Sequence, residues 1–210
     1  MGVLVWCLQK AGELVMANAD PLSAKAVQSV ATQLSNFLPS PKATVLGMAS
    51  APLKQPAVAE SLAVCYLTVQ QVTKPPENLT LLVTPSGMWC HLVRTANGAT
   101  HMAMSQSHAF GSDELEVQQL GESPVVAKLD AALSWLDTHV PDDNVMVRLL
   151  IAPAYFVHAL AVIRPKKITV LMVDQPDGMT TLQPETEYTI KDFLKRLAKA
   201  TPGTSLAESF

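Results

Sequence analysis

Apolar residues at intervals of three and four predict an amphipathic helix over residues 22–38. Asp20 and Pro21 stand directly before this stripe and suit the N-cap and the first position of a helix. The next segment, residues 39–56, contains four prolines, which interrupt both helices and central strands. We therefore expect a proline-rich connector between the first helix and the rest of the chain.

The middle of the chain has the pattern of an antiparallel β-meander over residues 61–104. Runs rich in Val, Leu, Tyr and Thr, bounded by Pro and Gly, predict strands over residues 61–72, 79–84 and 88–95. Asn97-Gly98 follows, and this dipeptide tolerates the positive φ angles of a type I′ turn. The chain is therefore expected to return antiparallel to the third strand.

The last third has longer apolar runs and a different order of elements. An apolar stripe after Ser123 and Pro124 predicts a helix that ends near His139. Four further elements are expected to alternate as strand, helix, strand and helix, over residues 145–151, 153–163, 168–173 and 185–200. This β-α-β-α order favours a parallel or mixed sheet with helices packed on it.

The whole pattern predicts an α/β fold of the α+β kind, in which helices pack on a mixed sheet that contains an antiparallel meander. A chain of 210 residues suits one ordinary domain, and no change in composition marks a boundary. The expected single domain, 1–210, has a helix at about 22–38, a connector at 39–56, a meander at 61–104, a C-terminal α/β part at 122–200 and a tail at 201–210.

The composition is rich in apolar residues and poor in charge. Hydrophobic residues make up 49% of the chain and charged residues only 16%, whereas about 25% is typical of globular domains. So few charged residues leave apolar surface to be covered by another molecule. We therefore expect a protein partner or a homo-oligomer.

The charge balance argues against nucleic acid as a partner. Fifteen Lys and Arg stand against eighteen Asp and Glu, for a net charge of -3, and no window holds enough positive charge to neutralise several phosphates. The second of two short basic stretches also fits the preference for cations at helix C-termini. The stretches are Arg164, Lys166 and Lys167, and then Lys191, Lys195, Arg196 and Lys199.

Cysteine usage and the amino terminus favour a soluble cytoplasmic protein. Cys7, Cys65 and Cys90 are odd in number, lack C-x-x-C spacing and have apolar neighbours, which is typical of buried thiols in a reducing compartment. Residues 17–19 resemble a signal-peptide cleavage site, but no basic region precedes them, and Met16 is an alternative start. No apolar run reaches the roughly 18 residues of a membrane span.

Metal binding is the first chemistry to test, because His91, His101 and His108 lie close to Cys90 in the sequence. On the expected hairpin, Arg94 pairs roughly with His101, so the first two histidines can approach one another. Neighbouring strand residues point to opposite faces, so only one of Cys90 and His91 can share a site with His101. Two ligands are fewer than a catalytic zinc needs, and we expect no metal.

Motifs for nucleophilic catalysis and for nucleotide binding are missing from the sequence. The hydrolase elbow G-x-S-x-G does not occur, and Cys90 stands among apolar residues that would raise the pKa of its thiol. Neither G-x-G-x-x-G nor G-x-x-x-x-G-K-[ST] occurs, so no nucleotide cofactor is expected. No residue is assigned a catalytic, cofactor-binding or metal-binding role.

Two polar residues in the last third are the remaining candidates for chemistry. Asp174 directly follows a predicted buried strand, where ligands bind in open α/β sheets. The composition of residues 174–178 also predicts a simple turn, which we favour. His158 falls on the predicted apolar helix and is expected to be a packed histidine.

Three classes of function remain. The preferred one is a non-catalytic interaction or assembly subunit, because the chain is poor in charge and contains nine methionines, which adapt to varied partners. The second is an enzyme of hydrolase type whose dispersed site draws on Asp174, His158, His91 and His101, which requires a pocket that contains at least two of them. The third is a binder of a small apolar ligand.

Overall fold

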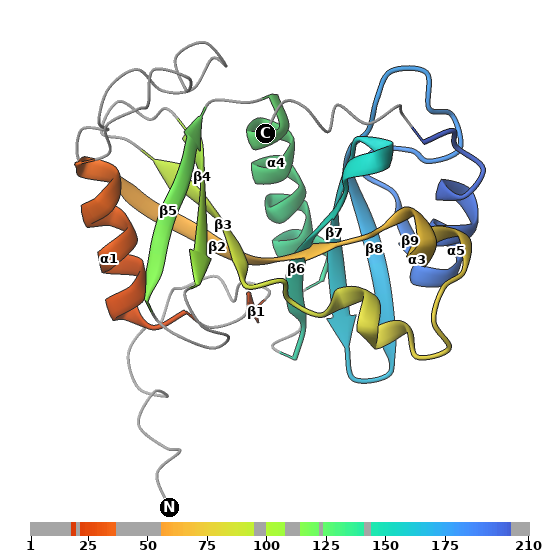
Figure 1. Cartoon of the computed structure of the whole chain (residues 1–210), viewed down its shortest axis with the longest axis horizontal. Helices are drawn as coiled ribbons and strands as arrows, with labels where there is room; N and C mark the ends of the chain where they lie inside the picture. The colour runs from red at the N-terminus through yellow and green to blue at the C-terminus, as the bar shows by residue number, and fades with distance from the viewer. Residues whose placement is uncertain are drawn as a thin grey trace, which may run out of the picture.

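Figure 1 shows the computed structural model of the chain. The structure describes residues 18–19, 22–36, 56–94, 100–107, 114–121, 124–140 and 144–202. The predicted connector at 39–56 therefore lies almost wholly outside the described residues, as do the Asn97-Gly98 turn, Cys7, His108 and most of the tail.

One mixed sheet forms the centre of the described part of the chain, as the sequence predicts. Its strand order is β5-β4-β3-β2-β6-β7-β8-β9, and β1 also pairs with β6. The pairs β1–β6 and β2–β6 are parallel, and the remaining pairs are antiparallel. The strands are β1 Asn18–Ala19, β2 Ala57–Tyr66, β3 Met88–Arg94, β4 Thr100–Ser107, β5 Leu115–Gly121, β6 Met146–Ala152, β7 Val157–Arg164, β8 Lys167–Asp174 and β9 Glu187–Thr189.

Strand β2 joins two antiparallel halves of the sheet. Its first part, from Ala57 to Ala63, pairs with β3. Its last residues, from Val64 to Tyr66, pair with β6 instead. The short strand β1 pairs with the first two residues of β6, which precede the residues of β6 that pair with β2. The meander β2 to β5 and the second antiparallel set β6 to β9 are thereby held in one sheet.

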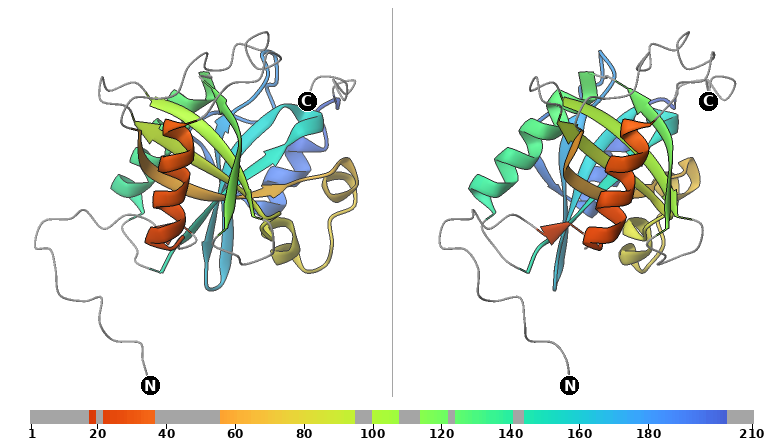
Figure 2. Two further views of the ribbon diagram at one scale, coloured as in Figure 1. Left: turned by 60° about the vertical axis from the view of Figure 1, so that its left-hand side comes forward. Right: turned by 90° about the vertical axis from the view of Figure 1, so that its left-hand side faces the viewer.

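Helices cover both faces of the sheet (Figure 2). Helix α4 (Pro124–His139) packs on one face and contacts residues of both halves. On the other face, α1 (Ala24–Ser35) covers β3, β4 and β5. There α5 (Ile190–Leu197), α3 (Val69–Thr73) and the 3-10 helix η1 (Leu79–Val83) cover β6, β7 and β8. None of the helices in the described ranges is long and apolar enough to cross a membrane.

The first helix begins later than predicted. Ser23 is its N-cap, and the Ser23 hydroxyl accepts a hydrogen bond from the Ala26 amide at 3.1 Å. The predicted cap, Asp20, lies outside the described residues, as does Pro21. Serine caps a helix as well as aspartate does.

The strand predicted over residues 61–72 is wrong at both ends. Strand β2 begins earlier and stops at Tyr66. Thr68 then starts α3 through a capping box: its amide donates to the Gln71 side chain at 2.9 Å, and the Gln71 amide donates to the Thr68 hydroxyl at 3.2 Å. This reciprocal pairing satisfies two helix-end donors and turns the chain out of the sheet.

The strand predicted over residues 79–84 is wrong, because this apolar run forms η1. The Asn78 side chain accepts from the Thr80 amide at 3.1 Å and caps the first turn. Leu82 and Val83 are buried against the α5 side of the sheet. At the other end, the Arg148 guanidinium of β6 donates to the Val83 carbonyl. A short apolar run fits a strand or a buried helix equally well, and these contacts decide between them.

The predicted helix over residues 153–163 is also wrong. Only Pro153–Tyr155 forms a helical turn, η2, and the rest is strand β7. Val157, Ala159 and Ala161 face the α5 side, whereas Leu160 and Val162 face α4. A strand buried on both faces shows no alternation of polar and apolar residues, so its sequence resembles that of a buried helix. The last third is consequently an antiparallel meander followed by a helix.

The remaining predicted elements are present with adjusted ends. Helix α4 and strands β6 and β8 match their predictions closely. The last helix is shorter than residues 185–200, because Glu187–Thr189 pairs with β8 as strand β9. Thr189 then caps α5, accepting from the Asp192 amide at 3.1 Å.

Helix α1 also covers the edge strand of the meander. The Gln33 side-chain amide donates to the Leu115 carbonyl at 2.7 Å, and its oxygen accepts from the Val117 amide at 2.9 Å. These two backbone groups of β5 are those that a further parallel strand would bind. The Gln33 carboxamide therefore takes the place of a neighbouring strand and blocks part of the open edge.

We expect Gln33→Ala to lower the free energy of unfolding by about 1 to 2 kcal/mol, because two backbone groups lose their partner. Urea unfolding measures this loss. Gln28→Ala is the matched control, since Gln28 is exposed on the same helix and should change stability by less than about 0.5 kcal/mol. Equal effects of the two substitutions would contradict a capping role for Gln33.

Candidate functional site

Four residues on neighbouring strands line up in one row at an end of the sheet. Tyr66 of β2 pairs with Ile151 of β6, Ile151 pairs with His158 of β7, and His158 pairs with Asp174 of β8. Strands β2 and β8 end at this row, and β6 ends one residue beyond it. It is therefore the carboxyl edge at which ligands bind in open α/β sheets.

Asp174 is the last residue of β8 and forms an ion pair with Lys128 of α4. Its side chain is 19% exposed, and that of Lys128 is 54% exposed. The following residues form the predicted turn, in which Gly178 has φ +86°. The prediction of a turn is confirmed. The sequence gives no sign that Lys128 of α4 binds the Asp174 carboxylate at the start of this turn.

His158 lies beside Asp174 on β7, and not on a helix as predicted. Burial lowers the pKa of His158, and the charge of Asp174 opposes this shift. The imidazole is thus neutral near pH 7. Its Nδ1 atom is buried and has no hydrogen-bond partner among the described residues. The structure therefore brings together two of the four residues in the predicted pool.

His91 and His101, the other two candidates, lie far from this row on the meander. The register pairs Arg94 with Thr100, one residue away from the predicted pairing with His101. His91 pairs with Ala103, which packs on the α1 face, whereas Cys90 packs on the α4 face. The prediction that Cys90 and His91 point to opposite faces is confirmed.

His91 takes part in a buried polar network across three strands. Its Nδ1 lies 2.8 Å from the Ser61 hydroxyl of β2, and its Nε2 lies 2.7 Å from the Ser105 hydroxyl of β4. His91 and Ser105 are both fully buried. Burial lowers the pKa of His91 to about 4. Because both ring nitrogens have partners and no solvent reaches the ring, this network is a structural feature of the core.

The described residues offer little for nucleophilic catalysis or metal binding. Cys65 and Cys90 are buried, as predicted, and burial raises the pKa of the Cys90 thiol to about 12, the wrong direction for a nucleophile. Within the described ranges, His158 forms no hydrogen bond to a serine, threonine or cysteine, and no group of three or more His, Cys, Asp or Glu residues could hold a metal.

Exposed apolar side chains stand beside this row. In the described part of the chain, large apolar residues with more than a third of their surface exposed are Tyr66, Val69, Leu81 and Phe156. Tyr66 ends β2, Val69 begins α3, and Phe156 lies in the turn between η2 and β7. Three of the four therefore lie at or just after the carboxyl ends of β2 and β6. Sequence reasoning missed them, because an apolar residue carries no signal of its own exposure.

Phe156 also has an unfavourable backbone conformation. Its φ of 52° and ψ of 38° lie in the left-handed region, and its side chain is 42% exposed. A bulky residue rarely adopts this conformation, which costs of order 1 kcal/mol. Neither burial nor backbone geometry favours phenylalanine at this position.

The comparisons with known proteins add no relative. No family model, no curated protein and no solved structure matches this chain.

Proposed function

We propose that the protein is a non-catalytic interaction subunit that binds another protein chain at the carboxyl edge of its sheet. The observation that supports this most is Phe156, an exposed aromatic residue in a strained turn where asparagine or glycine would be more stable. Strained residues cluster at ligand clamps and binding sites, where function offsets the cost in stability.

The carboxyl edge of the sheet resembles a protein interface in composition. Tyr66 and Phe156 provide exposed aromatic surface, and aromatic residues are enriched in the cores of such interfaces. His158 and the ion pair of Asp174 with Lys128 provide polar groups on the same edge. An aromatic centre with a polar rim is the usual arrangement at protein–protein contacts.

The experiment compares the wild-type protein with Phe156→Asn. Asparagine tolerates the left-handed conformation, so the variant should gain about 1 kcal/mol in stability, or a melting temperature about 2 to 4 °C higher. Loss of an aromatic anchor should at the same time weaken partner binding or self-association about 30-fold or more. Thermal unfolding measures the first effect. Light scattering and capture of partners from a native extract measure the second.

Leu81→Asn is the matched control, since Leu81 is 57% exposed but belongs to η1. It should leave association unchanged. A monomeric wild-type protein that captures nothing would contradict the proposal, as would a Phe156→Asn variant that binds as well as the wild type.

The alternative of a dispersed enzyme site keeps His158 and Asp174 as its candidates. The structure has a groove of about 810 Å³ between the turn of the β7–β8 hairpin and the start of α5. Neither His158 nor Asp174 lines this groove, and neither His91 nor His101 does. This groove therefore does not supply the pocket that the enzyme alternative requires.

A further inference from the structure

A groove of about 810 Å³ opens at the other end of the β7–β8 hairpin, away from His158 and Asp174. Residues of η1, the start of β6, the hairpin turn and the start of α5 line it. These segments are far apart in the sequence and meet only in the folded chain. The volume lies within the range of small-molecule sites, about 300 to 1,000 Å³.

The groove contains a set of apolar side chains from all four segments. They are Leu79, Met146, Ile163, Ile168 and Ile190. Ile190 is buried, and the other four are half-buried. Half-buried aliphatic side chains in a concavity leave apolar surface that a ligand can cover, which is favourable by roughly 25 cal/mol per Å².

Positive charge dominates the ionisable residues that line the groove. Four are basic, Arg164, Lys166, Lys167 and Lys191, and one is acidic, Glu77. The whole chain, by contrast, has a net charge of -3. The fold thus joins the first basic stretch of the sequence to one lysine of the second, although the two stretches are separate along the chain.

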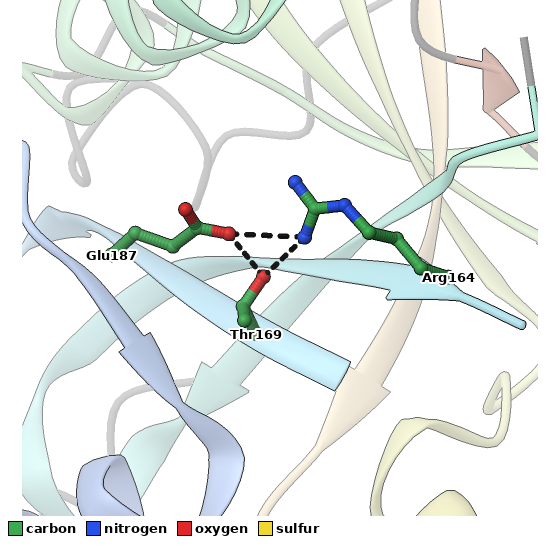
Figure 3. A network of polar contacts seen from close by, with 3 residues as sticks. All are labelled: Arg164, Thr169 and Glu187. Carbon is green, nitrogen blue, oxygen red and sulfur yellow. Dashed lines mark hydrogen bonds and ion pairs between the residues drawn. The ribbon is translucent and has the colours of Figure 1, made fainter. Parts of the chain in front are cut away.

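Arg164 already has partners (Figure 3). Its Nη1 atom donates to the Thr169 hydroxyl at 2.8 Å and to the Glu187 carboxylate at 3.1 Å, and the Thr169 hydroxyl also donates to Glu187. Burial raises the pKa of Glu187, but these hydrogen bonds and the charges of Arg164 and Lys167 outweigh it, so the pKa is lowered. This network connects the end of the β7–β8 hairpin to β9. Its hydrogen bonds do not involve the lysines that line the groove.

The three lysines of the groove differ from Arg164 in this respect. Lys166, Lys167 and Lys191 form no ion pair within 4 Å among the residues that the structure describes. Lys191 is the second residue of α5, where the helix dipole disfavours a cation. The helix C-terminus explains Lys195 and Arg196, as predicted, but it does not explain Lys191.

We infer that this groove binds an amphiphilic anion, with an aliphatic body against the apolar residues and a carboxylate or phosphate head group among Lys166, Lys167 and Lys191. A purely apolar ligand would make no use of the excess of positive charge in the groove. A small anion without a chain would leave the aliphatic surface exposed to water. The groove is a second binding site, separate from the edge proposed for protein binding.

Isothermal titration calorimetry of the full chain tests this inference with four probes. Octanoate and octyl phosphate carry both features, octanamide lacks the charge, and acetate lacks the chain. Octanoate or octyl phosphate should bind at one saturable site and more weakly at high salt. The tighter of the two identifies the head group as carboxylate or phosphate. Saturable binding of neither would overturn the inference, as would octanamide or acetate binding equally well.

A charge variant locates the site. Replacing Lys166, Lys167 and Lys191 together by Gln should weaken binding of the tighter probe about tenfold, the sum of three exposed ion pairs. The matched control replaces Lys25, Lys195 and Lys199 by Gln, which removes the same charge from exposed positions that do not line the groove. Equal effects of the two triple variants would place the ligand elsewhere. Because Phe156 is unchanged in both variants, the result is independent of the proposed protein-binding edge.

Discussion

Leu82→Ala is expected to lower the free energy of unfolding by about 2 to 5 kcal/mol, one of the two largest effects of a single substitution expected here. Leu82 is 1% exposed and packs with Val72, Tyr155 and the other residues of the α5-side core. Removing its side chain leaves a cavity at the point where η1 rests on the sheet. Guanidinium or urea unfolding measures the loss.

The neighbouring residue gives a sharp control. Leu81 stands next to Leu82 in η1 but is 57% exposed, so Leu81→Ala should change stability by less than about 0.5 kcal/mol. The comparison tests whether Leu82 is the buried residue and Leu81 the exposed one. If the segment were a strand shifted by one residue, the two positions would be exchanged. Similar losses for both variants would contradict the packing of η1.

The second large effect concerns His91 and the pH dependence of stability. In the unfolded chain a histidine has a pKa of about 6.5, whereas burial lowers that of His91 to about 4 in the folded protein. The folded state therefore resists protonation. The stabilisation that neutral His91 provides is complete above about pH 6.5 and is lost progressively as the pH falls to about 4. One pKa unit corresponds to about 1.4 kcal/mol, so the total change is on the order of 3 kcal/mol.

His91→Gln removes this titration while keeping a side chain that can hydrogen-bond to Ser61 or Ser105. Between pH 7 and pH 4, the difference in unfolding free energy between the wild type and the variant should move by on the order of 3 kcal/mol in favour of the variant. The lowered pKa of His158 acts in the same direction, but it is present in both proteins and cancels.

His139→Gln serves as the control for His91→Gln. His139 is exposed near the end of α4, where it stacks on Trp135 with 4.3 Å between ring centroids. Its replacement removes one imidazole from the surface and leaves the hydrogen bonds of His91 to Ser61 and Ser105 intact. Parallel stability profiles for the wild type and His91→Gln would show that His91 is accessible to protons in the folded state.

Several elements follow directly from the sequence. The stripes of α1 and α4 have a helical period because each helix buries one side and exposes the other. The opposite orientations of Cys90 and His91 follow from the pleat of any strand, whatever its register. The mixed sheet with its meander could be predicted because turn residues separate its strands.

Other elements depend on tertiary contacts. Residues 157–164 form a strand only because β6 and β8 provide partners on either side. Residues 79–83 form a helix because Asn78 and Arg148 satisfy its two ends. A short apolar run has no clear period in its polarity, so its neighbours decide its conformation.

The two proposed sites were beyond prediction for a related reason. The sequence singles out His158 and Asp174 but gives no sign that Lys128 binds the carboxylate. It likewise shows two basic stretches but not that the fold brings Lys191 to the groove beside Lys166. Periodicity along a chain records which side of each element is buried. Which surfaces stay exposed, and which charges meet on them, is decided by the packing of elements that are distant in sequence.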